Sequence, residues 1–193
     1  QVDYQDIYTE GITKITSEDF AYASQMDCSI KLLASSKAVG DSYRCMVAPF
    51  MLPKSHPLCN VNDVFNGVFV HGNMLGDAMF YGSGAGKLPT ASAVVADIVD
   101  MVKHRETNIH IEWNPEKKEL VDYKETLNRF FVRTTSDVAD VEAVFGEVSY
   151  VAGAQADNTI VAGETVFTTK AMTEAEFAEK AEKIAVVNRI RLA

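Results

Sequence analysis

The chain has 193 residues, of which 27 are acidic and 18 basic, so its formal net charge is −9, and 47% of the residues are hydrophobic. This hydrophobic fraction is typical of globular domains and excludes a disordered, solvating polymer. The sequence has no basic stripe and no apolar run near the ~20 residues of a membrane helix, so we expect neither a nucleic-acid nor a membrane partner.

The first third of the chain predicts a helix and an antiparallel hairpin. Thr16-Ser17-Glu18-Asp19 is typical of a helix start, with a hydroxyl cap and an acidic residue three positions later. Residues 29–34 and 43–52 are predicted strands, joined at a Gly40-Asp41-Ser42 turn. Proline then punctuates the expected connection, at Pro49, Pro53 and Pro57.

The middle of the chain predicts two more strands, a glycine-rich loop and a helix. The strands cover residues 64–70 and 78–81, and the loop is Gly82-Ser83-Gly84-Ala85-Gly86. Apolar residues at helical spacing follow Pro89, which predicts the strongest helix of the chain. Residues 108–113 are a further predicted strand.

The last third predicts alternating strands and helices after a charged linker. The linker covers residues 114–125, which are dense in charge and poor in large apolar groups. The predicted strands are 129–134, 148–152, 159–168 and 187–192, and the predicted helices are 138–145 and 173–185. This order, βαββαβ, is typical of a ferredoxin-like module.

The glycine loop is the segment with the clearest chemical suggestion. Glycines between a strand and a helix let the backbone approach a ligand closely, next to the positive end of the helix dipole. The loop is neither a P-loop nor a dinucleotide fingerprint, because Tyr81, Leu88 and Lys87 occupy positions where those motifs require glycine or a hydroxyl residue. A tight turn without a ligand is the alternative interpretation.

No other pattern predicts a reactive centre. The four histidines have no metal-ligand spacing, so we expect no metal site, and no serine or cysteine nucleophile motif occurs. Cys28, Cys45 and Cys59 form no CxxC motif, and their odd number favours reduced thiols and a cytoplasmic location.

Several short motifs, taken in order and spacing, resemble homoserine dehydrogenase. They are Glu10-Gly11-Ile12, Asp19 in its capped helix, Ile30-Lys31-Leu32-Leu33, His56-Pro57-Leu58, the run Tyr81 to Gly86, and Pro89-Thr90-Ala91-Ser92-Ala93-Val94. The resemblance implies an oxidoreductase that interconverts L-homoserine and L-aspartate 4-semialdehyde with NAD or NADP, on the route to threonine, methionine and isoleucine. It implies a small-molecule substrate and a homodimer, to which the hairpin around 30–33 and 45–50 is expected to contribute.

The resemblance also implies a domain plan. We expect an α/β fold (α+β with a mixed sheet) in residues 1–113, as the C-terminal portion of the catalytic and dimerisation domain. A linker follows at 114–125, and residues 126–193 are expected to form an ACT-like, ferredoxin-like module. The chain is then a fragment that lacks the Rossmann domain and the segment with the catalytic lysine.

Of the functional positions of the homoserine dehydrogenase family, the resemblance transfers only the glycine loop to this chain. The resemblance places Gly82, Gly84, Ala85 and Gly86 at the nicotinamide end of the cofactor, with no catalytic residue in this fragment. We therefore expect the fragment to bind cofactor weakly and to be inactive, and its sequence leaves the choice between NAD and NADP open because the absent domain makes it.

Residues 126–193, called the tail from here on, depart from the sequence pattern that is usual in effector-binding ACT modules. ACT modules that bind an amino acid typically have Asp-x-x-Gly after the first strand, whereas this chain has Thr134 to Ala139 without glycine. We expect a structural or oligomerising tail, with threonine binding as the second possibility. Two other classes stay open: an amino-acid-binding regulatory module without enzymatic activity, and an acidic scaffold without a small ligand.

Overall fold

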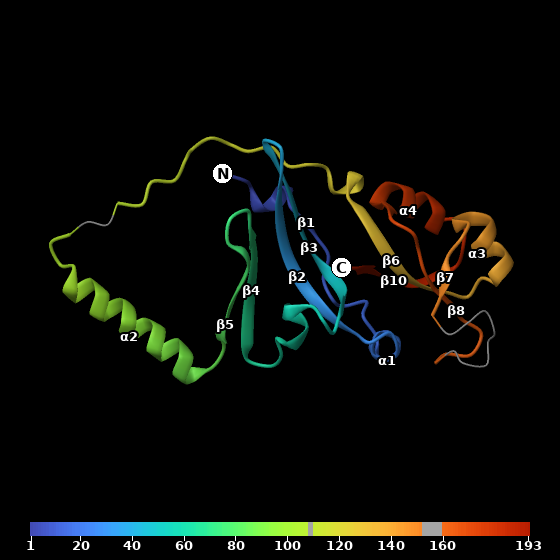
Figure 1. Cartoon of the computed structure of the whole chain (residues 1–193), viewed down its shortest axis with the longest axis horizontal. Helices are drawn as coiled ribbons and strands as arrows, with labels where there is room; N and C mark the ends of the chain where they lie inside the picture. Colours follow the sequence, from blue (N-terminus) through green and yellow to red (C-terminus); the bar gives the residue numbers. More distant parts are fainter. Residues whose placement is uncertain (108–109, 152–159) are drawn as a thin grey trace. The chain divides into compact units, whose positions relative to one another are not determined.

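The computed structural model describes residues 1–107, 110–151 and 160–193. Their contacts divide into two units: residues 1–54 together with 116–193, and residues 55–115. The chain therefore leaves the first unit after Lys54 and returns to it at Glu116, so the beginning and the end of the chain fold together (Figure 1).

A mixed, eight-stranded sheet forms the centre of the first unit. Its path runs β1-β3-β10-β6-β8-β7, with β2 paired to the free side of β3 and β9 paired to β6. Strand β10 runs parallel to β3 and antiparallel to β6, which joins the C-terminal strands to the N-terminal ones. The strands are β1 (Tyr8–Thr9), β2 (Cys28–Val39), β3 (Ser42–Pro53), β6 (Leu127–Thr134), β7 (Ser149–Tyr150), β8 (Thr165–Thr168), β9 (Met172–Thr173) and β10 (Val186–Leu192).

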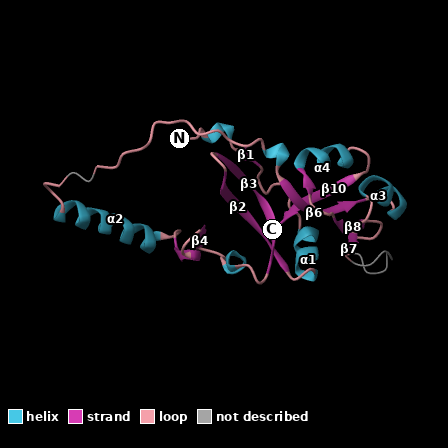
Figure 2. Ribbon diagram, turned by 45° about the horizontal axis from the view of Figure 1, so that its top comes forward, coloured by secondary structure: helices cyan, strands magenta, loops and turns pink. Residues whose placement is uncertain are grey.

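Helices cover the two faces of this sheet. On one face, α3 (Val138–Phe145) and α4 (Glu174–Ala181) pack through Val141, Phe145 and Phe177 onto Phe130, Val132 and Phe167. On the other face, α1 (Ser17–Gln25) packs through Tyr22 and Ala23 onto Met51, Phe131, Val166 and Ile190. The alternation of side chains along β6 thus supplies two separate cores, and Figure 2 shows α1 and α4 on opposite sides of the strands.

Local sequence signals account for the starts of these helices. The Thr16 N–H donates to the Asp19 carboxylate at 2.9 Å, as the predicted capping pattern requires. At α3 and α4 the bond runs in the opposite sense, because the Asp137 and Thr173 side chains accept from the backbone N–H groups of Asp140 and Glu176. The described residues also form three short 3-10 helices: η1 (Tyr4–Asp6), η2 (Pro57–Asn60) and η3 (Tyr123–Glu125).

The predicted hairpin is confirmed, and it is longer than expected. Strands β2 and β3 pair antiparallel from Cys28↔Pro53 to Val39↔Ser42. Pro49 lies inside β3, not in a connection. The Val47 carbonyl accepts from the Glu10 N–H, and the Met51 carbonyl accepts from the Ala193 N–H. The same edge of β3 therefore faces the β1 segment near Val47 and β10 near Met51. Pro49 lies between them, where its missing N–H removes no bond to either strand.

The second unit is a hairpin followed by one long helix. Strands β4 (Phe65–Gly72) and β5 (Gly76–Ser83) form a separate antiparallel sheet, and α2 (Lys87–Lys103) follows the glycine loop. Pro89 is the third residue of α2, still within the first turn where an N–H has no partner in the helix. Among the described residues, no helix combines the length and the apolar character needed to cross a membrane.

Some predicted strands are shorter or missing. Residues 110–113 form no regular structure, and residues 108–109 and 152–159 lie outside the described residues. The predicted strand at 159–168 is reduced to β8, and the predicted strand at 148–152 to β7. Ile111 and Trp113 pair with no strand among the described residues, and their side chains are exposed.

We expect the core between the sheet and α4 to be sensitive to truncation. Phe130 is fully buried and its ring stacks on Phe177 at 4.1 Å, so Phe130→Ala should lower the free energy of unfolding by about 3–5 kcal/mol. Leu127 is in the same strand and 61% exposed, and Leu127→Ala should cost less than about 1 kcal/mol. Urea unfolding of both variants measures the contrast, and equal losses would contradict this assignment of the core.

Candidate functional site

The four predicted cofactor residues lie together where β5 passes into α2. Gly82 pairs with Asn66 near the end of the hairpin, and Gly84, Ala85 and Gly86 connect Ser83 to Lys87. The Val64 carbonyl accepts from the N–H groups of Gly84 and Ala85 at 3.2 and 3.4 Å. These two amides are therefore engaged with Val64. The side of Gly82 where a Cβ would stand is open to a ligand, and the first amides of α2 have no partner within the helix.

Each glycine of the loop has its own structural reason. Gly86 has φ +111°, a conformation that L side chains rarely adopt, and it caps α2. A Cβ on Gly84 would come within 1.8 Å of the Asn66 side-chain nitrogen, so Asn66 would have to move. Gly82 has no heavy atom within 4 Å of its Cβ position, so it is open to a close approach from outside.

Helix α2 exposes its apolar residues. The exposed set includes Leu88 (79%), Val95 (57%) and Ile98 (50%), and the other large apolar residues of the helix are exposed as well: Val94, Val99, Met101 and Val102. A monomeric protein seldom exposes so continuous an apolar helix. The helix that follows the loop therefore has the character of an interaction surface.

A pocket of about 670 Å³ lies elsewhere, in the first unit. Its walls combine two aromatic rings that stack at 4.0 Å, Tyr8 and Tyr123, with an exposed ion pair of Asp6 and Lys117. Both charges are compensated, and none of the glycine-loop residues lines this pocket. Its chemistry gives no reason to move the candidate site away from the loop.

The loop after β6 is closed by its own hydrogen bonds. The Thr135 N–H donates to the Ala185 carbonyl, the Ser136 N–H to the Thr134 hydroxyl, and the Ala185 N–H to the Ser136 hydroxyl. Asp137 is engaged as the cap of α3. The backbone that would capture an effector amino acid in this loop is thus partly engaged within the protein.

The described residues contain no group of three or more His, Cys, Asp or Glu side chains placed to hold a metal ion. Cys28, Cys45 and Cys59 form no disulfide bond in the described part of the chain.

Comparison with known proteins identifies the family. The family model of homoserine dehydrogenase matches residues 1–99, just over half of the chain. The chain belongs to the homoserine dehydrogenase family. The homoserine dehydrogenase of Bacillus subtilis is 40% identical over 103 residues, which are 53% of this chain and 24% of that protein. The one from Corynebacterium glutamicum is 36% identical over 159 residues, 77% of this chain and 35% of its own length.

Solved structures of the family extend the likeness to the tail. The crystal structure of a homoserine dehydrogenase from Thiobacillus denitrificans matches 99% of this chain with a TM-score of 0.78 at 27% identity. A Staphylococcus aureus homoserine dehydrogenase matches the same share with a TM-score of 0.69 at 25% identity. In both cases the chain covers 48% of the other chain, so it spans about half the length of these relatives.

The sequence analysis missed a set of buried charges shared by the two ends of the chain. Arg133 contacts Asp19 and Glu164, and Arg191 contacts Glu10 and Glu174. Burial by itself lowers the pKa of both arginines. Their hydrogen bonds to these carboxylates and the carboxylate charges raise the pKa by more than that, so the net direction is upward. Arginine within an apolar strand, as in the runs 130–134 and 189–192, is the signal that could have indicated such pairs.

We expect the glycine loop to tolerate substitution at one end only. Gly86→Ala places a Cβ at φ +111° and should destabilise the second unit by about 1–3 kcal/mol, whereas Gly82→Ala should change its stability by less than about 1 kcal/mol. Hydrogen exchange of α2 and thermal unfolding measure both effects. Equal stability of the two variants would contradict the described loop conformation.

We also expect Glu10 to make stability depend on pH. Burial raises the pKa of Glu10, but hydrogen bonds and charges from Arg191 and Arg189 lower it more, so it lies below its usual value of 4.5. The stabilisation is then fully present above pH 4.5 and is lost as the pH falls through the lower, folded-state pKa. Urea unfolding should show Glu10→Gln less stable than the parent at neutral pH, with the difference shrinking in acid. A pH-independent difference would contradict this.

Proposed function

We propose that this chain is part of an enzyme that interconverts L-homoserine and L-aspartate 4-semialdehyde with NAD or NADP. The observation that carries the proposal is the family match over residues 1–99, which includes the glycine loop. The pathway implied is the biosynthesis of threonine, methionine and isoleucine, and cysteines that form no disulfide bond among the described residues are in keeping with a cytoplasmic enzyme.

The loop fits a role at the cofactor. The open side of Gly82 permits close contact with a planar ring, and the first amides of α2, at the other end of the loop, have no partners inside the helix. Gly86 sets the direction of the chain at this point, and Gly84 and Ala85 hold the loop against β4 through the Val64 carbonyl. Bound NAD or NADP supplies the hydride acceptor or donor. The loop residues position that group and offer no acid or base.

The exposed apolar face of α2 supports the view that the chain works within a longer protein. The family relatives are about twice as long as the aligned chain. We propose that the cofactor domain and the catalytic lysine belong to the unmatched half, that α2 packs against it, and that this chain alone binds cofactor weakly and has no dehydrogenase activity.

The domain plan is proposed on the family resemblance: 1–113 as part of the catalytic and dimerisation domain, 114–125 as a linker, and 126–193 as an ACT-like module. The antiparallel order β10-β6-β8-β7, with α3 and α4 on one face, supports the module. A homodimer through the β2–β3 hairpin is supported by the exposure of Leu32 (50%) on β2, which pairs only with β3 among the described strands.

The tail is proposed to be structural, with threonine as the second possibility. The bonds that close the loop between Thr134 and Ala185 favour the structural role. A regulatory module without enzymatic activity remains the alternative function. Saturable binding of threonine by the chain, together with an inactive full-length protein, would favour it. An acidic scaffold would be inactive as well but would bind no threonine.

The decisive experiment compares the complete product of the gene with this chain. Homoserine-dependent formation of reduced cofactor is expected from the complete protein and not from the 193-residue chain. Turnover by the chain alone would contradict its proposed inactivity. A complete protein that is folded and binds cofactor, yet shows no turnover, would contradict the proposed function.

A matched pair of variants in the complete protein tests the loop. Gly82→Val fills the open side of the loop, and we expect the Michaelis constant for the cofactor to rise about tenfold with little change in stability. Gly72→Val, at the other end of the hairpin, is the control, since its Cβ position has only ordinary contacts. Unchanged kinetics of Gly82→Val would exclude the loop as a cofactor contact.

A further inference from the structure

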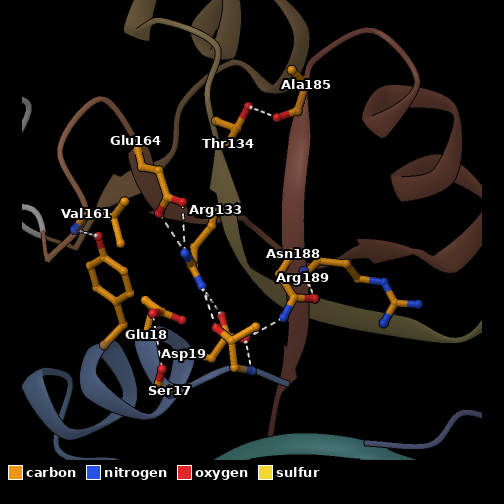
Figure 3. A network of polar contacts seen from close by, with 12 residues as sticks. Ser17, Glu18, Asp19, Arg133, Thr134, Val161, Glu164, Ala185, Asn188 and Arg189 are labelled. Atoms are coloured by element: carbon orange, nitrogen blue, oxygen red, sulfur yellow. Dashed lines mark hydrogen bonds and ion pairs between the residues drawn. The ribbon is translucent and has the colours of Figure 1, made fainter. Parts of the chain in front are cut away.

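The two buried arginines of the tail use their donors in the same way. Arg133 directs its Nε and Nη2 groups at both oxygens of Glu164, each at 2.8 Å, and its Nη1 group at Asp19, also at 2.8 Å (Figure 3). Glu164 belongs to the C-terminal part of the chain, and Asp19 to helix α1. The Nε/Nη2 edge of the Arg133 guanidinium is thus paired with a carboxylate of the tail, and its Nη1 group donates to the N-terminal segment, residues 1–54.

Arg191 repeats this arrangement. Its Nε and Nη2 groups donate to the two oxygens of Glu174 at 2.6 and 2.9 Å, and its Nη1 group donates to Glu10 at 2.7 Å. Arg189 adds a second contact to Glu10, at 2.9 Å. Here too the paired edge stays within the tail, and the remaining donor reaches the N-terminal segment.

The two contacts lie on opposite faces of the sheet. Arg133 lies opposite Asn188 in the β6–β10 pairing, and Asn188 also donates to Asp19 beneath α1. Arg191 lies opposite Phe130, whose ring stacks on Phe177 of α4. Because neighbouring residues of a strand point to opposite faces, the N-terminal segment is held from both sides.

The strand pairing that joins the tail to residues 1–54 is short. Strand β10 pairs with β3 at two positions, Arg191↔Phe50 and Leu192↔Met51. So short a ladder fixes the register weakly. Charged side chains of defined geometry add to this specification, since a misplaced register would separate Asp19 from Arg133 and Glu10 from Arg191.

We propose that residues 126–193 dock onto residues 1–54 through two arginine forks, Arg133 with Asp19 and Arg191 with Glu10. Each fork is preorganised by a carboxylate of the tail, Glu164 or Glu174, and recognises a single carboxylate of the N-terminal segment. The tail is therefore a fixed structural partner of the segment that carries helix α1 and the Glu10 turn. This inference is independent of the proposed enzymatic activity.

Arginine is required by this geometry. A guanidinium offers five donors in a plane and serves two carboxylates at once, whereas the ammonium group of lysine is a point charge on a flexible stem. Lysine at either position would keep the charge and lose one of the two partners. The conservative substitution therefore distinguishes a fork from a simple charge.

Hydrogen exchange of the complete 193-residue chain tests the forks. We expect Arg133→Met and Arg133→Lys to speed exchange in α1 about 100-fold, and the same changes at Arg191 to do so around Tyr8 and Thr9. The amides of α3 and β8 should keep their protection. Lys170→Met is the control, because the Lys170–Glu147 pair is exposed. Full protection in the lysine variants, or a uniform loss along the chain, would overturn the proposal.

A second pair of variants leaves the tail unchanged and covers the case in which the arginine variants do not fold. Asp19→Asn and Glu10→Gln remove the charge of the N-terminal partner, while the Arg133–Glu164 and Arg191–Glu174 edges stay intact. We expect faster exchange in α1 and around Tyr8, with a protected tail. Wild-type protection in both segments would overturn the proposal.

A double-mutant cycle separates docking from helix capping, because Asp19 also accepts from the Thr16 N–H. If the two residues act together, Asp19→Asn combined with Arg133→Met should exchange in α1 no faster than Arg133→Met alone. Independent, multiplicative effects on the exchange rate would show that Asp19 acts only as a cap and would overturn this fork.

Discussion

Two ionic contacts, Arg133 with Asp19 and Arg191 with Glu10, join the C-terminal residues 126–193 to the N-terminal residues 1–54. Among the described residues, strand pairing between 126–193 and 1–54 consists of two residue pairs of β10 and β3, so side chains have a large part in how these segments meet. Arg133 and Arg191 are 4% and 0% exposed, and each satisfies two carboxylates with directed hydrogen bonds. Buried charges are costly unless they are fully paired, so this arrangement favours one register over its alternatives.

The rest of the first unit follows from that junction. With β10 beside β3, the sheet becomes continuous, and its two faces are covered by α1 on one side and by α3 and α4 on the other. The aromatic residues of β6 alternate between the two cores, Phe130 toward α4 and Phe131 toward α1. The N-terminal and C-terminal segments thus share one core structure, although about sixty residues of the second unit separate them in the sequence.

The second unit has a different character. Its hairpin and glycine loop are defined by local geometry, whereas the apolar residues of α2 are exposed. In a family whose solved structures are about twice as long as this chain, the exposed helix is in keeping with a role at an interface. The proposed cofactor contact lies at the start of this helix, where a rigid glycine turn combines with amides that lack helical partners.

The sequence by itself determined the local structure: the capped helices, the β2–β3 hairpin, the hairpin and glycine loop of the second unit, and the family. These depend on residues close together in the chain, such as Thr16 with Asp19 or Gly86 at its positive φ. Only the tertiary structure decided that Glu10 and Asp19 face Arg191 and Arg133, and which strands lie beside β3 on either side of Pro49. Those facts depend on pairings between residues more than a hundred positions apart, or on which strand lies beside β3, and no local pattern encodes such neighbours.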